Sequence, residues 1–352
     1  MLIMRNTSNV KESLKEILTE WRETGAREGS PRDFDMQLVE GDEILVVMGA
    51  RRSGKTYLCY QIIRELKKKY PSDNIIYINF EDERLYPLSG SELSLLWDAC
   101  REVFEIDVQQ RIFLFVDEVQ NLKHWSKWAR RITDQNKNLK LIITGSSAKL
   151  LSKEIASELR GRSINHTVFP MSFSEFLGVK KVTLPPTDLL LSLDRPLVVK
   201  QFREYVAVGG FPAVMESPNR RELLKSYFNV MFYRDIVERH RIQNIRLLED
   251  FLMLLVDQTS CPFSISATAK KLEEFGHSFS KNTLSNFLRY ATDAFLAFEV
   301  KKYSFKVREQ IRAYRKIYSI DHGLVDGIRF AFMDNYGRVL ENIVYLQLRR
   351  QG

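Results

Sequence analysis

The chain has 352 residues, of which 44% are apolar and 28% are charged, the balance of a folded, water-soluble protein. This length exceeds what one ordinary hydrophobic core supports, so two or three domains are expected. No stretch approaches the roughly 20 apolar residues that cross a bilayer, and the amino terminus lacks the apolar core of a signal peptide. We therefore exclude a membrane-embedded protein and expect a cytoplasmic one without a membrane partner.

The net charge of +8 favours a polyanionic partner, although a chain can also simply be basic, so the distribution of the charges has to decide. The cysteines Cys59, Cys100 and Cys261 are scattered and lack CxxC or CxxH spacing. This pattern excludes a disulfide framework and a zinc site. We expect all three to be small buried apolar residues.

The first part of the chain predicts a helix followed by a layered α/β domain. Apolar residues recur at helical spacing from Val10 to Trp21, which indicates an amphipathic helix within an amino-terminal extension, residues 1–40. From Glu43 onward, short apolar runs alternate with helical stretches, as in a parallel sheet covered by helices. The predicted strands are residues 44–48, 74–80, 112–116, 139–144 and, less clearly, 164–169.

The loop after the first predicted strand reads GARRSGKT, from Gly49 to Thr56, and matches G-x-x-x-x-G-K-[ST] between a strand and a helix. Such a loop curls its backbone N–H groups toward phosphates, and the helix that follows adds its positive end. Lys55 would reach the β- and γ-phosphates, and Thr56 would bind Mg²⁺. The alternative is a chance match in a glycine-containing loop. The predicted nucleotide-binding residues are Gly49, Ala50, Arg51, Arg52, Ser53, Gly54, Lys55, Thr56 and Tyr57.

A second acidic motif follows the strand IFLFV, where Asp117 and Glu118 are adjacent. Asp117 would hold Mg²⁺ through water, and Glu118 would orient and polarise a water for in-line attack. Taken alone, the pair could be a solvated strand end. Together with the phosphate loop it predicts a P-loop NTPase core with about five parallel strands over residues 41–176.

Two further positions are candidates for the chemistry. Thr144 ends the strand LKLIIT and would lie beside the γ-phosphate, because ligands gather at the carboxyl ends of parallel strands. It could equally cap the helix that starts at Ala148. Arg160 and Arg162 precede the last predicted strand, and one of them, Arg162 by preference, could stabilise transition-state charge in its own site or a neighbour's. The alternative is that both are surface arginines.

The second half of the chain is predicted to be mostly helical. Paired prolines within residues 177–188 indicate a linker, and we assign residues 177–245 to this linker and a helical region. Helices at 251–259, 266–275 and 281–292, followed by strands at 296–303 and 313–320, give the order of a winged helix-turn-helix within residues 246–325.

Residues 281–316 of this segment could bind double-stranded DNA. Lys281, Asn282, Ser285, Asn286 and Arg289 form a polar face opposite an apolar stripe from Thr283 to Ala291. The hairpin carries seven bases against Glu299 and Glu309. These bases are Lys301, Lys302, Lys306, Arg308, Arg312, Arg315 and Lys316. The alternative is a packing or protein-docking module with solvated charges.

The combined motifs resemble an archaeal and bacterial AAA+-class P-loop ATPase family that has a G-x-R-R-x-G-K-T loop and a conserved carboxy-terminal region of unassigned role. They are GARRSGKT, DEVQ, ITGSSA, the GR of Gly161 and Arg162, FPMSFSEF, GGFP, YRDI and IDHGL. The resemblance implies a P-loop core with an additional strand that binds ATP and Mg²⁺, and a helical lid within residues 177–245. A winged helix and then a restriction-endonuclease-like domain are implied to follow. It assigns functional roles to Lys55, Thr56, Asp117, Glu118, Thr144 and Arg162.

Residues 337–352 resemble the opening of that nuclease-like domain, so residues 326–352 are expected to be its truncated start, with Glu341 marking its first helix. The acidic and lysine residues of the domain come later in the family, so no nuclease activity is expected. The chain end at Gly352 could be natural or a shortened boundary.

The leading functional hypothesis is an ATPase switch that acts on DNA or a protein partner. The first alternative is a binding or regulatory module that holds nucleotide and hydrolyses little. The second is a small-molecule phosphotransferase, against which Glu118 directly after Asp117 counts. Formation of a homo-oligomer is left open.

Overall fold

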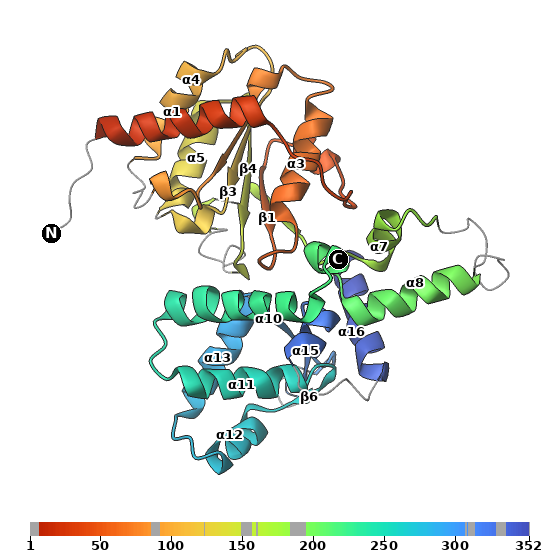
Figure 1. Cartoon of the computed structure of the whole chain (residues 1–352). Coiled ribbons are helices and arrows are strands. Elements are labelled where there is room, and N and C mark those ends of the chain that lie inside the picture. Colours follow the sequence, from red (N-terminus) through yellow and green to blue (C-terminus); the bar gives the residue numbers. More distant parts are fainter. Residues whose placement is uncertain are drawn as a thin grey trace. The chain divides into compact units, whose positions relative to one another are not determined.

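The computed structural model describes residues 7–85, 92–122, 124–148, 157–159, 161–183, 195–306, 308, 314–328 and 336–351. The chain divides into two compact units (Figure 1). The first comprises Met1–Gly49 and Lys55–Val168, and the second comprises Ala50–Gly54 and Phe169–Gly352. The domain boundaries predicted from the sequence stay predictions.

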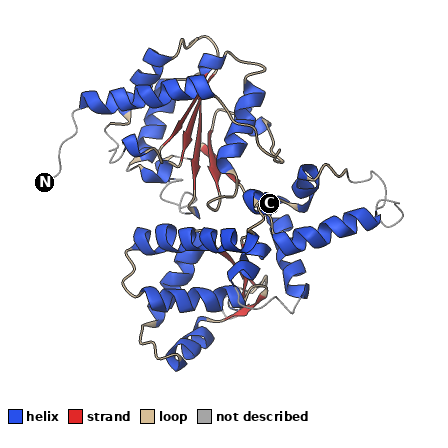
Figure 2. Cartoon of the chain, viewed as in Figure 1, coloured by secondary structure: helices blue, strands red, loops and turns tan. Residues whose placement is uncertain are grey.

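The first unit is built on a five-stranded parallel sheet, in agreement with the predicted α/β fold class. Its strands are β1 (Ile44–Met48), β2 (Ile75–Asn79), β3 (Ile112–Asp117), β4 (Leu139–Gly145) and β5 (Ser163–Thr167), in the order β2-β3-β4-β1-β5. Every residue of β1, β3 and β4 is buried. Helices cover these strands (Figure 2), which explains why they read as continuous apolar runs rather than alternating ones.

The helices of this unit are α1 (Thr7–Thr24), α2 (Gln37–Glu40), α3 (Lys55–Leu66), α4 (Ser94–Val103) and α5 (Trp125–Gln135), with short 3₁₀ turns at Ser72–Asn74, Glu83–Leu85 and Val119–Asn121. The predicted amino-terminal helix is confirmed as α1. Its apolar stripe, which includes Val10, Leu14 and Leu18, is buried, and the helix packs against α4. The ring of Trp21 lies 4.7 Å from that of Tyr77, which anchors the helix beside β2.

Lys140 is a fully buried lysine in β4. Its ammonium donates to the carbonyls of Leu38 (2.9 Å), Gly41 (2.9 Å) and Glu43 (2.6 Å), and so holds the turn that leads from α2 into β1. Burial lowers the pKa of Lys140 to about 8. The side chain is therefore costly to bury in its charged form, even with three acceptors around it.

The helices of the second unit are α7 (Phe173–Val179), α8 (Arg195–Val208), α9 (Pro212–Glu216), α10 (Arg220–Val230), a π-helix (Met231–Glu238), α11 (Ile245–Asp257), α12 (Ile265–Glu274), α13 (Lys281–Asp293), α15 (His322–Ile328) and α16 (Tyr336–Gln351). Its strands are β6 (Cys261–Phe263), β7 (Ala297–Lys301) and β8 (Arg315–Ser319), in an antiparallel sheet of order β6-β8-β7. The paired prolines of the predicted linker lie outside the described residues.

The predicted order of three helices and then two strands is confirmed as α11, α12, α13, β7 and β8. The apolar stripe of α13 is buried, including Leu284, Phe287 and Leu288, whereas Thr283 is half-buried. The sequence analysis missed β6, which has only three residues and contains Pro262. A proline is tolerated there because β6 is an edge strand.

The GGFP and IDHGL motifs meet in one buried turn of the second unit. The carboxylate of Asp321 accepts hydrogen bonds from the backbone N–H groups of Gly210 (2.6 Å) and Leu324 (3.0 Å). A Cβ atom at Gly323 would lie 2.4 Å from the carbonyl oxygen of Val208, so only glycine fits this close approach. These motifs therefore have a structural role in joining α8 to α15.

Glu341, which was expected to mark the start of a further domain, lies on α16 and accepts hydrogen bonds from Lys316 and Tyr318 of β8, both at 2.7 Å.

The cysteine prediction is confirmed for Cys59 and Cys100, which are buried and free. It is wrong for Cys261, which is only half-buried because it lies on the edge strand β6. Among the described helices, none combines the length and the apolar character needed to span a membrane.

Candidate functional site

The GARRSGKT loop leaves the carboxyl end of β1, which lies between β4 and β5, and runs into α3 at Lys55. Gly54 has a φ of 102°, a conformation that a side chain would strain. The predicted strand, loop and helix are therefore present in the order that a phosphate-binding loop requires. Ala50 and Ser53 of the loop are buried, whereas Tyr57 on α3 is 46% exposed.

The loop and the acidic motif come together at the carboxyl ends of β1 and β3. The hydroxyl of Thr56 donates to Oδ2 of Asp117 at 2.7 Å. The ammonium of Lys55, which is buried, donates to the carbonyl of Gly49 at 3.2 Å and lies 3.4 Å from Oε1 of Glu118. Four residues that sequence reasoning selected from two distant segments thus form one cluster.

Asp117 accepts hydrogen bonds from three side chains. It is fully buried and accepts from Thr56, from the hydroxyl of Tyr77 at 2.7 Å, and from Thr144. Burial raises the pKa of Asp117 and the negative charge of Glu118 raises it further, whereas the three hydrogen bonds lower it. The carboxylate is therefore kept in place by donors from three different elements.

Thr144 links the two acidic residues. Its hydroxyl donates to the carboxylate of Asp117 and accepts from the backbone N–H of Glu118 at 3.0 Å. Glu118 has a left-handed backbone conformation, with φ 57° and ψ 47°, which is uncommon for a residue with a side chain. The hydrogen bond from its N–H supports this conformation, and the residue's side chain is the one that approaches Lys55. The helix that Thr144 could have capped lies largely outside the described residues.

Two neighbours of the cluster were missed by the sequence analysis. Gln120 donates to the carboxylate of Glu118 and to Oγ of Ser146 (3.1 Å), and its own oxygen accepts from the N–H of Ser146 at 3.2 Å. Tyr77 contributes its hydroxyl from β2. A glutamine two positions after the acidic pair was a usable signal, because its side chain can reach back over the 3₁₀ turn. No sequence signal pointed to Tyr77, because the sequence does not reveal that β2 lies beside β3.

The donor set suits a magnesium ion. Mg²⁺ prefers hard oxygen ligands and usually binds one or two protein groups together with phosphates and waters. Thr56 and Asp117 provide one hydroxyl and one carboxylate, which lie 2.7 Å apart. Within the described part of the chain, no cluster of three or more histidine, cysteine or acidic residues could hold a metal ion by itself. A Mg²⁺ ion on this hydroxyl and carboxylate would take its further oxygen ligands from waters or phosphates.

The arginines of the loop make contacts that the sequence did not predict. The guanidinium of Arg51 lies against Asp235, with Nε 3.1 and 3.0 Å from the two carboxylate oxygens, and that of Arg52 lies 5.6 Å from the centre of the Tyr227 ring. All four residues belong to the second unit. Both guanidinium groups thus contact protein groups. The contact with nucleotide predicted for Arg51 and Arg52 would therefore be made by their backbone N–H groups.

Arg162 is not brought together with the other candidates. Its carbonyl accepts from the N–H of Ile44 at 2.8 Å, so it lies at the start of β5 beside the start of β1. The loop follows the other end of β1, and at about 3.3 Å per residue the two are roughly 16 Å apart. The Arg162 side chain, 56% exposed, forms an ion pair with Asp134. This placement favours a surface role or a role in a neighbouring subunit. Arg160 lies outside the described residues.

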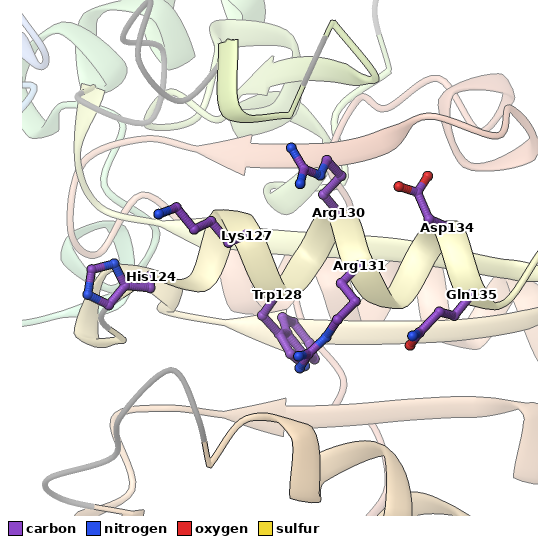
Figure 3. A pocket seen from close by; sticks show the side chains of 7 residues that line it. All are labelled: His124, Lys127, Trp128, Arg130, Arg131, Asp134 and Gln135. Atoms are coloured by element: carbon purple, nitrogen blue, oxygen red, sulfur yellow. The ribbon is translucent and has the colours of Figure 1, made fainter.

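A separate pocket of about 470 Å³ lies along α5 (Figure 3). Its lining consists of His124, Lys127, Trp128, Arg130, Arg131, Asp134 and Gln135. None of the residues predicted to bind nucleotide contributes to it. The pocket is therefore distinct from the cluster at the carboxyl ends of β1 and β3.

Comparison with solved structures finds remote similarity. The Orc1 protein of Aeropyrum pernix in complex with DNA is 14% identical, with a TM-score of 0.34 over 98% of this chain and 95% of that chain. Cdc6p of Pyrobaculum aerophilum is 15% identical, with a TM-score of 0.28 over 98% of this chain and 96% of that chain. TM-scores this low carry no argument about function.

Sequence comparison is more informative. Residues 41–177 match the family model of an AAA domain, and residues 199–330 match a domain of unknown function. An uncharacterised protein of Methanocaldococcus jannaschii is 38% identical over 91% of this chain and 69% of its own length. An uncharacterised protein of Haemophilus influenzae is 30% identical over 90% of this chain and 77% of its own length. The chain therefore belongs to one family with these archaeal and bacterial proteins, and its residues 41–177 are an AAA domain of the P-loop type.

Proposed function

We propose that the protein is a magnesium-dependent ATPase that acts as a nucleotide-driven switch. The observation that carries the proposal is the cluster in which Thr56 donates to Asp117 at 2.7 Å and Lys55 lies 3.4 Å from Glu118. The match of residues 41–177 to an AAA domain supports it. A phosphate-binding loop and an acidic pair in contact are the groups that nucleotide hydrolysis needs.

Each residue has a distinct role in this proposal. Lys55, together with the N–H groups of the loop, would neutralise the triphosphate and would leave Glu118 for it, since the phosphates carry the larger negative charge. Glu118, once released from Lys55, would hold a water in line with the γ-phosphate and accept its proton. Thr144 would fix the positions of Glu118 and Asp117 relative to each other through its two hydrogen bonds.

Thr56 and Asp117 would hold Mg²⁺, Thr56 directly and Asp117 through water. Bound Mg²⁺ supplies charge neutralisation at the phosphate oxygens. Tyr77 and Thr144 would keep the Asp117 carboxylate oriented toward this position, because each donates a hydrogen bond to it. Arg162 lies beside the start of β1, away from the loop, so the role proposed for it is on the nucleotide of a neighbouring subunit.

A single-turnover assay with labelled ATP tests the hydrolytic role. Glu118→Gln keeps the shape of the side chain and removes its basicity, so the rate of hydrolysis should fall about 10²- to 10⁴-fold while binding persists. Lys55→Ala should lose binding as well. Glu65→Gln is a matched control, because Glu65 is exposed on α3 and pairs only with Lys68 among the described residues. If Glu118→Gln hydrolyses ATP as fast as the parent, the assigned base is wrong.

The same assay separates the alternatives. A binding or regulatory module would bind ATP tightly and release it unchanged in both the parent and Glu118→Gln. A small-molecule phosphotransferase would transfer the label to an acceptor and release little free phosphate. The contact between Lys55 and Glu118 favours hydrolysis, because it places a carboxylate beside the group that would bind the γ-phosphate.

We further propose that the segment from α11 to β8 is a winged helix that binds double-stranded DNA through residues 281–316. The strand β7 ends in Lys301, and the exposed residues that follow it include Lys302, Tyr303, Phe305 and Lys306. Phe305 is 93% exposed. Lysines contact DNA phosphates, and an exposed Phe can insert between base steps, so this combination is compatible with DNA binding. A docking site for a protein, including a second copy of the chain, is the alternative.

Not all of the predicted bases support this surface equally. Arg315 forms an ion pair with Glu299 at 2.8 Å, and Lys316 forms one with Glu341 at 2.7 Å. These two bases are therefore used at least partly within the second unit. Arg312 and Glu309 lie outside the described residues. Support for DNA binding rests mainly on Lys301, Lys302 and the residues around Phe305.

A further inference from the structure

Asp235 is a buried carboxylate that the proposed chemistry does not use. It belongs to the YRDI motif and is 1% exposed. Its two oxygens lie 3.1 and 3.0 Å from Nε of Arg51, and Oδ1 also accepts from Arg239 at 3.2 Å. Burying a carboxylate is costly unless cations and hydrogen bonds compensate for the lost water, and Arg51 and Arg239 contribute to this compensation.

The backbone that carries Asp235 is unusual. Met231–Glu238 forms a π-helix that continues α10, and π-helical turns are rare and often mark functional sites. The wider turn changes the direction in which each side chain points relative to the α-helix before it. Asp235 lies within this π-helix, so the π-helical geometry sets the direction from which its carboxylate meets Arg51.

A second contact holds the same loop. The guanidinium of Arg52 lies 5.6 Å from the centre of the Tyr227 ring on α10, within the range of a cation–π interaction. Arg52 also has a left-handed backbone, with a φ of 66°. For a residue with a side chain this conformation is strained, and it persists only where the surroundings hold it. The two arginine contacts supply that constraint.

These contacts fix the loop at its midpoint. Arg51 and Arg52 lie between Gly49 and Lys55, and only five residues separate these two, so a displacement of the middle of the loop changes the direction of the N–H groups beside it. The positions of the loop N–H groups and of Lys55 therefore depend on where the two arginine side chains are held. Affinity for phosphate is higher when the loop N–H groups and Lys55 are already ordered in the free protein. Otherwise the free energy of ordering them is subtracted from the free energy of binding.

We propose that Asp235 is a positioning residue for the phosphate-binding loop, which it orders through Arg51 without contacting the nucleotide. This inference rests on the proposed function, since it assumes that the loop binds ATP. By thermodynamic reciprocity, ATP binding then stabilises the segment from α10 to Arg239.

The test is a double-mutant cycle on the affinity for a fluorescent adenine nucleotide with Mg²⁺. Asp235→Asn and Arg51→Gln should each weaken binding about tenfold, within the usual 5- to 150-fold range of coupling between sites. The double variant should bind about as weakly as either single one, because both changes remove the same constraint. Asp250→Asn is the control, because Asp250 pairs with His277 at 2.6 Å elsewhere in the second unit and should leave the affinity unchanged.

The design keeps loss of folding separate from loss of positioning. Arg51→Gln leaves Asp235 paired with Arg239, so this variant should keep its fold if Asp235→Asn does not. Unchanged or tighter binding by Arg51→Gln, or effects that add fully in the double variant, would overturn the positioning role while leaving the proposed function intact. A parent protein that binds no nucleotide would instead overturn the proposed function, and this inference with it.

Discussion

The hydroxyl of Thr144 donates to the carboxylate of Asp117 and accepts from the N–H of Glu118 at 3.0 Å. One side chain at the end of β4 therefore orients both acidic residues at the end of β3. The sequence analysis placed Thr144 beside the γ-phosphate. Its observed partners indicate that any effect of Thr144 on hydrolysis is transmitted through Asp117 and Glu118.

Replacing Thr144 by Val should both destabilise the protein and slow hydrolysis. The N–H of Glu118 would lose its acceptor in a buried position, which costs about 1–3 kcal/mol. Urea unfolding and single-turnover hydrolysis measure the two effects. Thr144→Ser keeps the hydroxyl and should retain most of both properties. Equal rates for the Val and Ser variants would show that the hydroxyl is not needed.

Removing the hydroxyl of Thr56 should change the magnesium requirement. Thr56→Ala leaves Asp117 with its hydrogen bonds from Tyr77 and Thr144, so the fold should be kept. The Mg²⁺ concentration that half-saturates ATP binding should rise about tenfold or more, since an inner ligand is lost. A magnesium titration of nucleotide affinity measures this change. Thr133→Ala on α5 is the control, and an identical magnesium dependence in Thr56→Ala would contradict the assigned site.

Lys140 should make stability depend on pH in the alkaline range. Its pKa is about 8 in the folded protein and 10.5 in the unfolded chain, so the unfolded state binds more protons between these values. The contribution of Lys140 to the free energy of unfolding should therefore rise as the pH increases from 8 to 10.5. The rise should be at most about 1.4 kcal/mol for each pH unit.

Urea unfolding at about pH 8 and about pH 10 measures this effect, since these values bracket most of the interval between the two pKa values. Other groups titrate in the same range, so the comparison is with Lys140→Met, which keeps the aliphatic stem and has no proton to lose. Between the lower and the higher pH, the free energy of unfolding of the parent should increase relative to that of Lys140→Met. A constant difference across this range would show that the three carbonyl acceptors keep the pKa of Lys140 near its ordinary value.

Neutralising Lys301, at the end of β7, and Lys302, which follows it, should reduce the salt dependence of DNA binding. Each phosphate contact contributes about 0.9 to the slope of log affinity against log salt, so Lys301→Gln with Lys302→Gln should lower the slope by about 1.8. Fluorescence anisotropy with a duplex oligonucleotide between low and moderate salt measures it. Lys67→Gln with Lys69→Gln on the surface of the first unit is the matched control. An unchanged slope would remove these lysines from the DNA interface.

Much of the fold could be predicted because burial leaves a direct signature. Strands β1, β3 and β4 are buried along their whole length, so their apolar runs were unambiguous. Strand β5 has no fully buried residue, and its predicted bounds were shifted by one or two residues. Strand β6 was missed because three residues around Pro262 leave no periodic pattern, and the strand exists only through its pairing with β8.

The central cluster was predictable for a different reason. Lys55, Thr56, Asp117 and Glu118 occupy fixed places relative to strand ends, and the carboxyl ends of parallel strands share one edge of the sheet. The contact between Arg51 and Asp235 was not predictable, because it joins residues 184 positions apart and depends on a π-helix. Arg162 was chosen for its residue type and nearness to a strand, but it precedes β5, and the strand's direction puts it at the opposite edge.

The claim on which the account depends is that the GARRSGKT loop binds adenine nucleotide together with magnesium. Isothermal titration of the parent protein and of Lys55→Ala with ATP, with Mg²⁺ present or chelated, tests it most directly. The account predicts saturable binding by the parent that weakens when Mg²⁺ is removed, and a loss of at least about tenfold in affinity in Lys55→Ala, since a buried charge-assisted contact to phosphate is removed. Absence of binding by the folded parent, or equal affinity in Lys55→Ala, would contradict it.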